Sequence, residues 1–264
     1  MGKYSIGFRM KFDDVEPEDI RRIIIEYLQK FDRYEIKITK HLISSGKIKA
    51  VLDASEELAN GRYSLHLLKN LLSDEQSYAE TIQLINVLQD YKTSDMIYLV
   101  THIPSGDLME YLGKIIDIST KLPENYILLL ENEEKNSDNQ QYLRQINRLC
   151  YALQRKNILN VGICLDIGHL LFDLHNEGIS SEIGLALVSK MQYMLSQVKE
   201  IHVHDYNEKS HLQLQKGMMD LGIVSKFIIA NSLIVPIIIE ATVVRPDEDG
   251  VRQVLIMKEN LKEH

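Results

Sequence analysis

The sequence predicts an α/β protein, a closed (β/α)8 TIM barrel that forms a single domain over residues 1–264. Short apolar runs occur eight times along the chain, and longer amphipathic segments of helical period separate them. Such alternation favours a parallel sheet whose strands are buried on both faces. Eight repeats in a chain of 264 residues match the usual size of a closed barrel.

The eight predicted strands are short apolar runs of the length that buried strands have. They cover residues 3–9, 33–38, 63–68, 97–102, 126–131, 161–166, 200–205 and 236–241. An open, doubly wound sheet is the alternative arrangement, but the chain has no Gly-x-Gly-x-x-Gly or Walker-type loop to favour it. No linker or low-complexity stretch divides the chain, so one domain is expected.

The predicted helices lie between these strands. Residues 17–31 open with Pro17, Glu18 and Asp19, and a proline followed by acidic residues favours the start of a helix. The pattern over 46–60 is the least clear of the series. The other expected helices are 73–91, 105–122, 139–157, 181–199, 217–232 and 249–263.

Charge and cysteine content narrow the class of protein. The net charge is −8 and there is no basic tail, which disfavours nucleic acid and anionic membranes as partners. The net charge does not exclude a local basic groove. Cys150 and Cys164 do not form a CxxC pair. The first residues lack a signal-peptide core, and no apolar run reaches the ~20 residues that a membrane span needs. A cytoplasmic protein is therefore expected, and the sequence is compatible with a homo-oligomer.

Ionisable side chains end the inward-facing rows of six consecutive predicted strands, the third to the eighth. In a strand, alternate residues share a face, and barrel enzymes build their sites at the C-terminal ends of the strands. We therefore expect these side chains to meet at one mouth of the barrel. They are His66, His102, Glu131, Asp166, His202 with His204, and Glu240.

Each of these residues alone has an ordinary structural explanation. A single histidine more often hydrogen-bonds a neighbour than binds a metal, and a single carboxylate at a strand end is usually solvated or caps the next helix. Together, converging carboxylates and imidazoles would repel one another or stay unsatisfied without a cation. Mixed ligation by Asp, Glu and His suits Mn²⁺, Zn²⁺, Fe²⁺ or Co²⁺ better than Ca²⁺. The sequence predicts a divalent metal (Mn, Zn, Co or Mg) and no organic cofactor.

Four short motifs contain the ionisable residues at the strand ends. They are LLLEN (128–132), LDIGH (165–169), IHVHD (201–205) followed by His211 and Gly217, and IIIEA (237–241). These motifs resemble the xylose-isomerase-like TIM-barrel superfamily, which holds sugar isomerases and epimerases together with the endonuclease IV class of apurinic-site nucleases (AP endonuclease family 2). The resemblance covers roughly three quarters of the chain, from the third predicted strand onward.

The resemblance implies site residues one by one. It implies a metal site made of Glu131, Asp166, His202 and Glu240, in which the two glutamates also act as acid and base on the substrate carbon of an epimerase. The protein is therefore expected to be a divalent-metal-dependent isomerase or epimerase of a small sugar or sugar-like polyol. Four histidines match additional positions, which bind substrate in the epimerases or zinc in the nucleases. His169 and His211 match either of these roles, and His66 and His102 match nuclease zinc ligands.

The chain departs from both patterns. Lys209 stands where the nucleases have an aspartate, and the segment 67–70 has no aromatic residue to wedge into DNA. Gln215 replaces a glycine of the substrate loop of the sugar enzymes. A zinc phosphodiesterase with two or three metals, acting on apurinic DNA or a smaller phosphodiester, stays open as an alternative, and so does a non-catalytic metal-binding barrel. His204 and Lys216 are further candidates for substrate contact, or ordinary loop residues.

Overall fold

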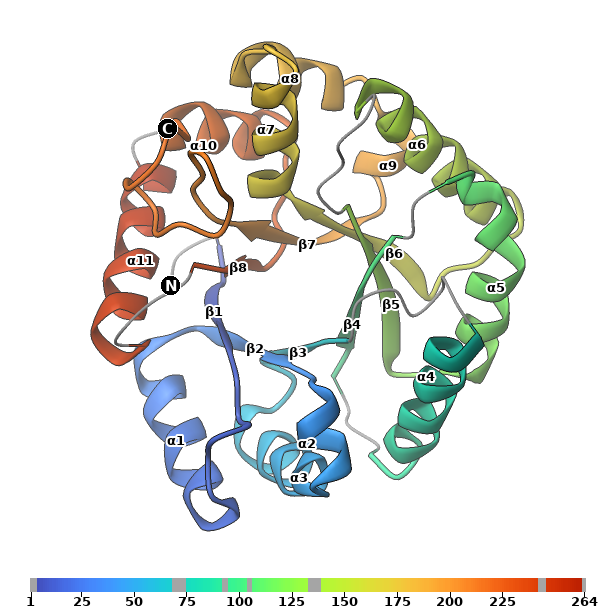
Figure 1. Cartoon of the computed structure of the whole chain (residues 1–264), viewed down its shortest axis with the longest axis vertical. Coiled ribbons are helices and arrows are strands. Elements are labelled where there is room, and N and C mark those ends of the chain that lie inside the picture. Colours follow the sequence, from blue (N-terminus) through green and yellow to red (C-terminus); the bar gives the residue numbers. More distant parts are fainter. Residues whose placement is uncertain are drawn as a thin grey trace.

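A computed structural model describes residues 4–67, 75–91, 95–103, 106–132, 139–241 and 246–262. Eight parallel strands close into a barrel in the order β1 to β8, and the helices surround it (Figure 1). The predicted (β/α)8 barrel is thus confirmed. The strands are β1 Ile6–Met10, β2 Arg33–Lys37, β3 Tyr63–His66, β4 Ile97–His102, β5 Tyr126–Glu131, β6 Val161–Asp166, β7 Val198–Val203 and β8 Ile237–Ile239.

Most helices lie where the amphipathic pattern of the sequence predicts them. Some residues of the predicted strands and helices lie outside the described residues, namely 3, 68, 73–74, 105 and 263. None of the described helices combines the length and apolar character that a bilayer crossing requires. The helices are α1 Pro17–Lys30, α2 Lys40–Ser44, α3 Lys47–Ala59, α4 Glu75–Leu88, the 3-10 turn η1 Leu108–Tyr111, α5 Leu112–Lys121, α6 Asn139–Arg155, α7 Ile167–Asn176, α8 Ser181–Val188, α9 Gln192–Leu195, α10 Leu221–Ala230 and α11 Pro246–Lys262.

The structure differs from the prediction around β7. Instead of one helix over 181–199, α8 and α9 are separated at Met191, whose backbone leaves the helical region at φ −87° and ψ 66°. The strand then begins at Val198, two residues earlier than expected. Apolar residues continue through the break, so the hydrophobic pattern alone did not reveal it.

Three side-chain caps explain the other differences in helix boundaries. Asp166 caps the unexpected helix α7 by accepting a hydrogen bond from the His169 amide, and Thr39 caps the short α2 in the same way from Leu42. Asp220 caps α10, so that helix starts at Leu221 rather than at residue 217. A capping oxygen satisfies an amide that has no partner inside the helix, which fixes where the helix begins.

Below its mouth, the interior of the barrel has an apolar side and a charged side. On β4, β5 and β6, Val100, Leu129 and Cys164 form a small buried cluster. On β2 and β7, buried Glu35 and Glu200 face His202. Outward-facing strand residues instead join the main core beneath the helices. On the side of β2 and β7, charged groups therefore reach below the C-terminal mouth, whereas on β4, β5 and β6 the ionisable residues His102, Glu131 and Asp166 stand at the strand ends.

Helix α1 packs one face against the main core beneath the helices, and substitutions on its two faces can test this packing. Ile24 is fully buried and lies one turn after buried Ile20, whereas the next residue, Ile25, is 42% exposed. We expect Ile24→Ala to lower the free energy of unfolding by about 3 kcal/mol, because it removes buried methyl groups and leaves a cavity. Urea denaturation measures this, with Ile25→Ala as the matched control on the solvent side. Equal effects of the two substitutions would contradict the described face of α1.

Candidate metal centre

Four buried side chains converge at the C-terminal mouth of the barrel. His66 ends β3, Glu131 ends β5, His202 lies in β7, and Glu240 directly follows β8. Each offers one ligand atom, and these atoms all lie within 4.8 Å of one another. Nitrogen and oxygen ligands from four different strands at this spacing can surround a single divalent ion.

Glu131 is at the centre of this group. Its Oε2 lies 2.8 Å from His66 Nε2 and 3.2 Å from His102 Nε2, and its Oε1 lies 2.5 Å from His202 Nδ1. Burial alone would raise the pKa of the Glu131 carboxyl, but the charges of His202, His102 and His66 outweigh it and hold that pKa well below its usual range. Glu131 is therefore a buried carboxylate that three imidazoles face.

The state of His66 shows that these residues fit a metal. Burial and the nearby charge of Arg9 lower the pKa of His66 to about 4, so the ring is neutral near pH 7. Its Nδ1 lies 3.0 Å from the Leu67 carbonyl and its Nε2 lies 2.8 Å from Glu131 Oε2, and both oxygens can only accept. A neutral ring has a single N–H for these two acceptors, and a cation held by Nε2 and Glu131 would satisfy both contacts.

Arg9 and Glu35 belong to the same charged network, and the sequence analysis missed both. Arg9 on β1 donates to the carboxylates of Glu35 and Glu240, and its Nη2 lies 3.4 Å from His202 Nδ1. Glu35 Oε2 lies 3.1 Å from His202 Nε2. A signal was present, because alternation in RYEIK places Arg33, Glu35 and Lys37 on the face opposite Tyr34 and Ile36.

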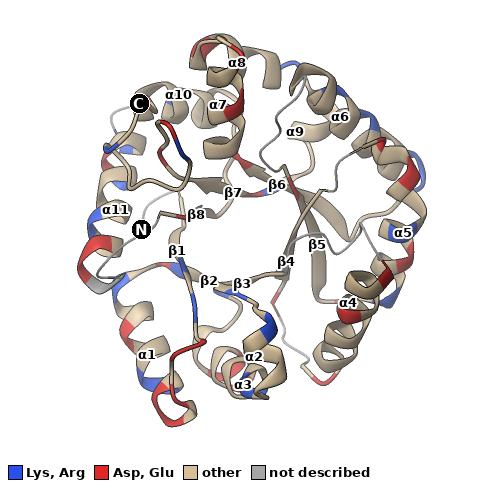
Figure 2. Cartoon of the chain, in the orientation of Figure 1, with Lys and Arg blue, Asp and Glu red and all other residues tan. Residues whose placement is uncertain are grey.

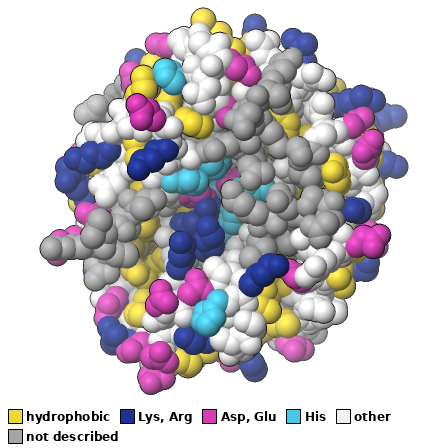
Figure 3. Space-filling view, in the orientation of Figure 1, with side chains coloured by type: hydrophobic (Ala, Val, Ile, Leu, Met, Phe, Trp, Pro, Cys, Tyr) yellow, Lys and Arg dark blue, Asp and Glu magenta, His cyan; other side chains and the backbone are white. Residues whose placement is uncertain are grey.

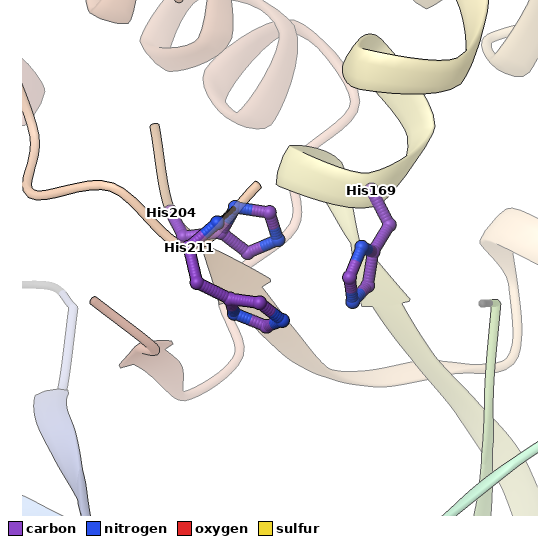
Figure 4. A group of neighbouring side chains, drawn as sticks. All are labelled: His169, His204 and His211. Atoms are coloured by element: carbon purple, nitrogen blue, oxygen red, sulfur yellow. Dashed lines mark hydrogen bonds between the residues drawn. The ribbon is translucent and has the colours of Figure 1, made fainter. Parts of the chain in front are cut away.

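A second group lies beside the first and consists of His169, His204 and His211 (Figure 4). Their ligand nitrogens also lie within 4.8 Å of one another, and the ring centroids are 4.3–4.9 Å apart. The His169 amide donates to Asp166 Oδ1, which lies 3.4 Å from His204 Nε2. Burial and the charges of the other two histidines lower the pKa of His211 to about 3, so its ring is neutral.

The structure therefore distributes the predicted ligands over two adjoining groups. Glu131, His202 and Glu240 come together with His66, whereas Asp166 lies beside the three histidines. The two groups are neighbours, since Asp166 and His202 are paired across β6 and β7. Gly168 leaves room for the His204 ring, because a Cβ at that position would lie 2.5–2.6 Å from ring atoms of His204.

The loop after β7 holds two non-glycine residues in the left-handed region of backbone conformation, which favours glycine. Gln215 adopts φ 66° and His211 adopts φ 58°, in the left-handed region. Buried Asp205 holds this course by accepting hydrogen bonds from the amides of Tyr206, Lys216, Gly217 and Met219. The side chain of Lys216 is exposed, and the structure does not bring it to the cavity described next.

A cavity of about 350 Å³ opens above the first group. Figure 3 shows histidine and basic side chains meeting at the hollow in the centre of this face. In the sequence, residues 67–70 contain no aromatic side chain to wedge into DNA, and residues 68–70 of this segment lie outside the described residues. The described lining residues are Arg9, Lys37, Ile38, Thr39, Lys40, His66, Leu67, His102, His169, His211 and Glu240.

Glu35 gives a prediction about pH and stability in metal-free protein. Burial alone would raise its pKa, but Arg9 and His202 outweigh burial, and the net pKa falls below its ordinary value of 4.5. A lowered carboxyl pKa stabilises the fold above the ordinary value, and this contribution is lost as the pH falls from there toward the folded-state pKa. We expect Glu35→Gln to cost about 3 kcal/mol near neutral pH.

Urea denaturation between about pH 7 and pH 3 measures the effect, and the difference from wild type should shrink below about pH 5. Glu57→Gln is the matched control, because Glu57 forms an ion pair with Arg21 at the exposed surface. Its denaturation curve should follow that of the wild type. A difference for Glu35→Gln that stays constant over the whole pH range would contradict the ionised, paired state of Glu35.

Comparison with known proteins identifies the fold of the chain and finds no close sequence relative. No family model and no curated protein matches the chain. The crystal structure of AsfvAP:AG is 14% identical with a TM-score of 0.70, and the match covers 98% of this chain and 100% of that chain. A D-tagatose 3-epimerase-like protein is 18% identical with a TM-score of 0.65, covering 98% and 97%. A xylose isomerase-like TIM barrel protein from Mycobacterium smegmatis in complex with magnesium is 12% identical, with a TM-score of 0.61 and coverage of 98% and 97%.

Proposed function

Because the chain has the fold of the xylose-isomerase-like TIM barrels, we propose that it is a divalent-metal-dependent isomerase or epimerase of a small sugar or sugar-like polyol. One observation carries the proposal: Oε1 of Glu131 and Oε1 of Glu240 each lie 2.5 Å from the same nitrogen, Nδ1 of His202. Two carboxylates that reach a common point below a cavity can remove and return a proton on one substrate carbon. Structures of this fold include a D-psicose 3-epimerase with D-tagatose, which supports a ketose as the kind of substrate.

His66, Glu131, His202 and Glu240 would hold the metal, and Asp166 stays a predicted ligand from the adjoining group. A bound divalent ion would polarise the substrate carbonyl and so acidify the proton on the neighbouring carbon. One of Glu131 and Glu240 removes that proton, and the other returns it. Arg9 donates a hydrogen bond to Oε2 of Glu240 and forms an ion pair with its Oε1, which fixes the orientation of that carboxylate. His169 and His211 line the cavity wall, where their rings can bind substrate hydroxyls.

Proton transfer by Glu240 is testable without knowledge of the natural substrate. Mn²⁺-loaded protein is incubated with D-tagatose, D-allulose and related ketoses in D₂O, and NMR measures deuterium uptake at the carbon beside the carbonyl. Glu240→Gln should slow the exchange at least about 100-fold, because a general acid or base contributes that much or more. Glu57→Gln, at the exposed surface, is the matched control and should exchange at the wild-type rate. Full exchange by Glu240→Gln would show that this mechanism is wrong.

A metallo-phosphodiesterase is the second candidate, and the contacts of Glu131 favour it specifically. His66 and His102 approach one oxygen of Glu131, and His202 approaches the other. A carboxylate between two sets of imidazoles can be shared by two metal ions, and paired metals are typical of phosphodiester hydrolysis. The three-histidine group offers a further set of ligands.

Metal stoichiometry separates the two candidates. Under the isomerase proposal we expect one tightly held ion per chain after saturation with Zn²⁺ and desalting, and its loss in His202→Ala, measured by elemental mass spectrometry. His102→Ala should keep that ion, because His102 lies outside the group of four. Two or more ions per chain, one of them lost in His102→Ala, together with hydrolysis of bis(4-nitrophenyl) phosphate, would favour the phosphodiesterase.

A further inference from the structure

The cavity above the metal centre has a basic wall. Arg9, Lys37 and Lys40 line it, and Glu240 is its one carboxylate among the lining residues that the structure describes. Figure 2 shows basic residues on β1 and along β2 and α2, next to the barrel mouth. This local excess of positive charge is opposite in sign to the net charge of the chain, −8.

Lys37 stands directly beside the metal centre. It is the last residue of β2, two positions after Glu35 in the inward-facing row, and it is paired in register with His66 of β3. Neighbouring strands lie about 4.8 Å apart, so the Lys37 side chain rises into the cavity next to the His66 imidazole. A group bound by Lys37 would therefore belong to the same molecule that reaches the metal.

Lys40 extends the basic wall toward the rim. It is the first residue of α2, and its side chain is 73% exposed, with Glu80 at 3.6 Å as an ion-pair partner. An exposed pair at that distance contributes little and exchanges readily with other anions. Arg9 forms ion pairs with Glu35 and Glu240. Lys37 and Lys40 both line the cavity, so an anionic group bound there lies beside two ammonium groups.

We propose that the substrate carries an anionic group, a phosphate ester or a carboxylate, which Lys37 and Lys40 bind while its carbonyl end faces the metal centre. A cavity of about 350 Å³ accommodates a sugar with one such substituent. The inference rests on the proposed function for the sugar part of the molecule. The proposed anion-binding residues differ from Lys216, which the sequence suggested as a substrate contact, because Lys37 and Lys40 line the cavity.

Isothermal titration of Mn²⁺-saturated protein tests the subsite with three probes: D-tagatose, D-tagatose 6-phosphate and a hexuronate. We expect at least one anionic sugar to bind about tenfold more tightly than D-tagatose, as a charge-assisted hydrogen bond provides. Lys37→Gln and Lys40→Gln should each weaken the anionic sugar about five- to tenfold and leave D-tagatose within about twofold. Lys37→Arg should retain most of the affinity because it retains the charge. Lys226→Gln, at an exposed position of α10, is the matched control.

The outcomes distinguish the subsite from the reaction. Preference for the phosphate or for the hexuronate identifies which anion the lysines take, and both support the subsite. Equal binding of all three sugars by wild type, or no binding of either anionic sugar, overturns it, as does an equal loss in Lys226→Gln. Lysine-dependent binding without deuterium exchange would leave the anionic subsite in place and show that the proposed isomerisation is wrong.

Discussion

Several carboxylates are buried inside the barrel, and their negative charges determine which polar groups must surround them. Glu35, Glu131, Asp166 and Glu200 are fully buried, and Glu240 nearly so. Such a group of negative charges is unstable in an apolar interior unless cations and hydrogen-bond donors compensate it. Arg9 and His202 supply part of that compensation from within the chain. A divalent ion at the mouth supplies the remainder in the function proposed above.

The closed barrel makes this arrangement sterically feasible. Every second residue of a strand faces inward, so eight strands bring distant parts of the chain to the same level of the interior. Below the ionisable residues that end β4, β5 and β6, these inward positions hold the apolar cluster of Val100, Leu129 and Cys164. On β1, β2 and β7 they hold charged ones. The apolar cluster fills the barrel below the mouth, and the candidate ligands reach the cavity from the ends of β3 and β5, from β7 and from Glu240 after β8.

Much of this could be predicted from the sequence, because strand ends are visible as apolar runs that stop at an ionisable residue. Glu131, His202 and Glu240 were identified in that way, and the structure brings them together. Arg9, Glu35 and Lys37 were not, because a charged residue in the first two strands looks like an exposed position until the register of the closed sheet is known. The division of the ligands into two groups depends on rotamers and on the cap that Asp166 gives to α7, which no sequence pattern records.

The loop after β7 is held by one buried carboxylate rather than by the identities of its own residues. Asp205 collects four backbone amides, and backbone amides are present whatever the side chains are. Gln215 accordingly occupies a left-handed position that favours glycine. Variation along this rim can therefore change which molecules are admitted while the path of the chain is preserved, so that selectivity can diverge in such barrels without a redesign of the scaffold.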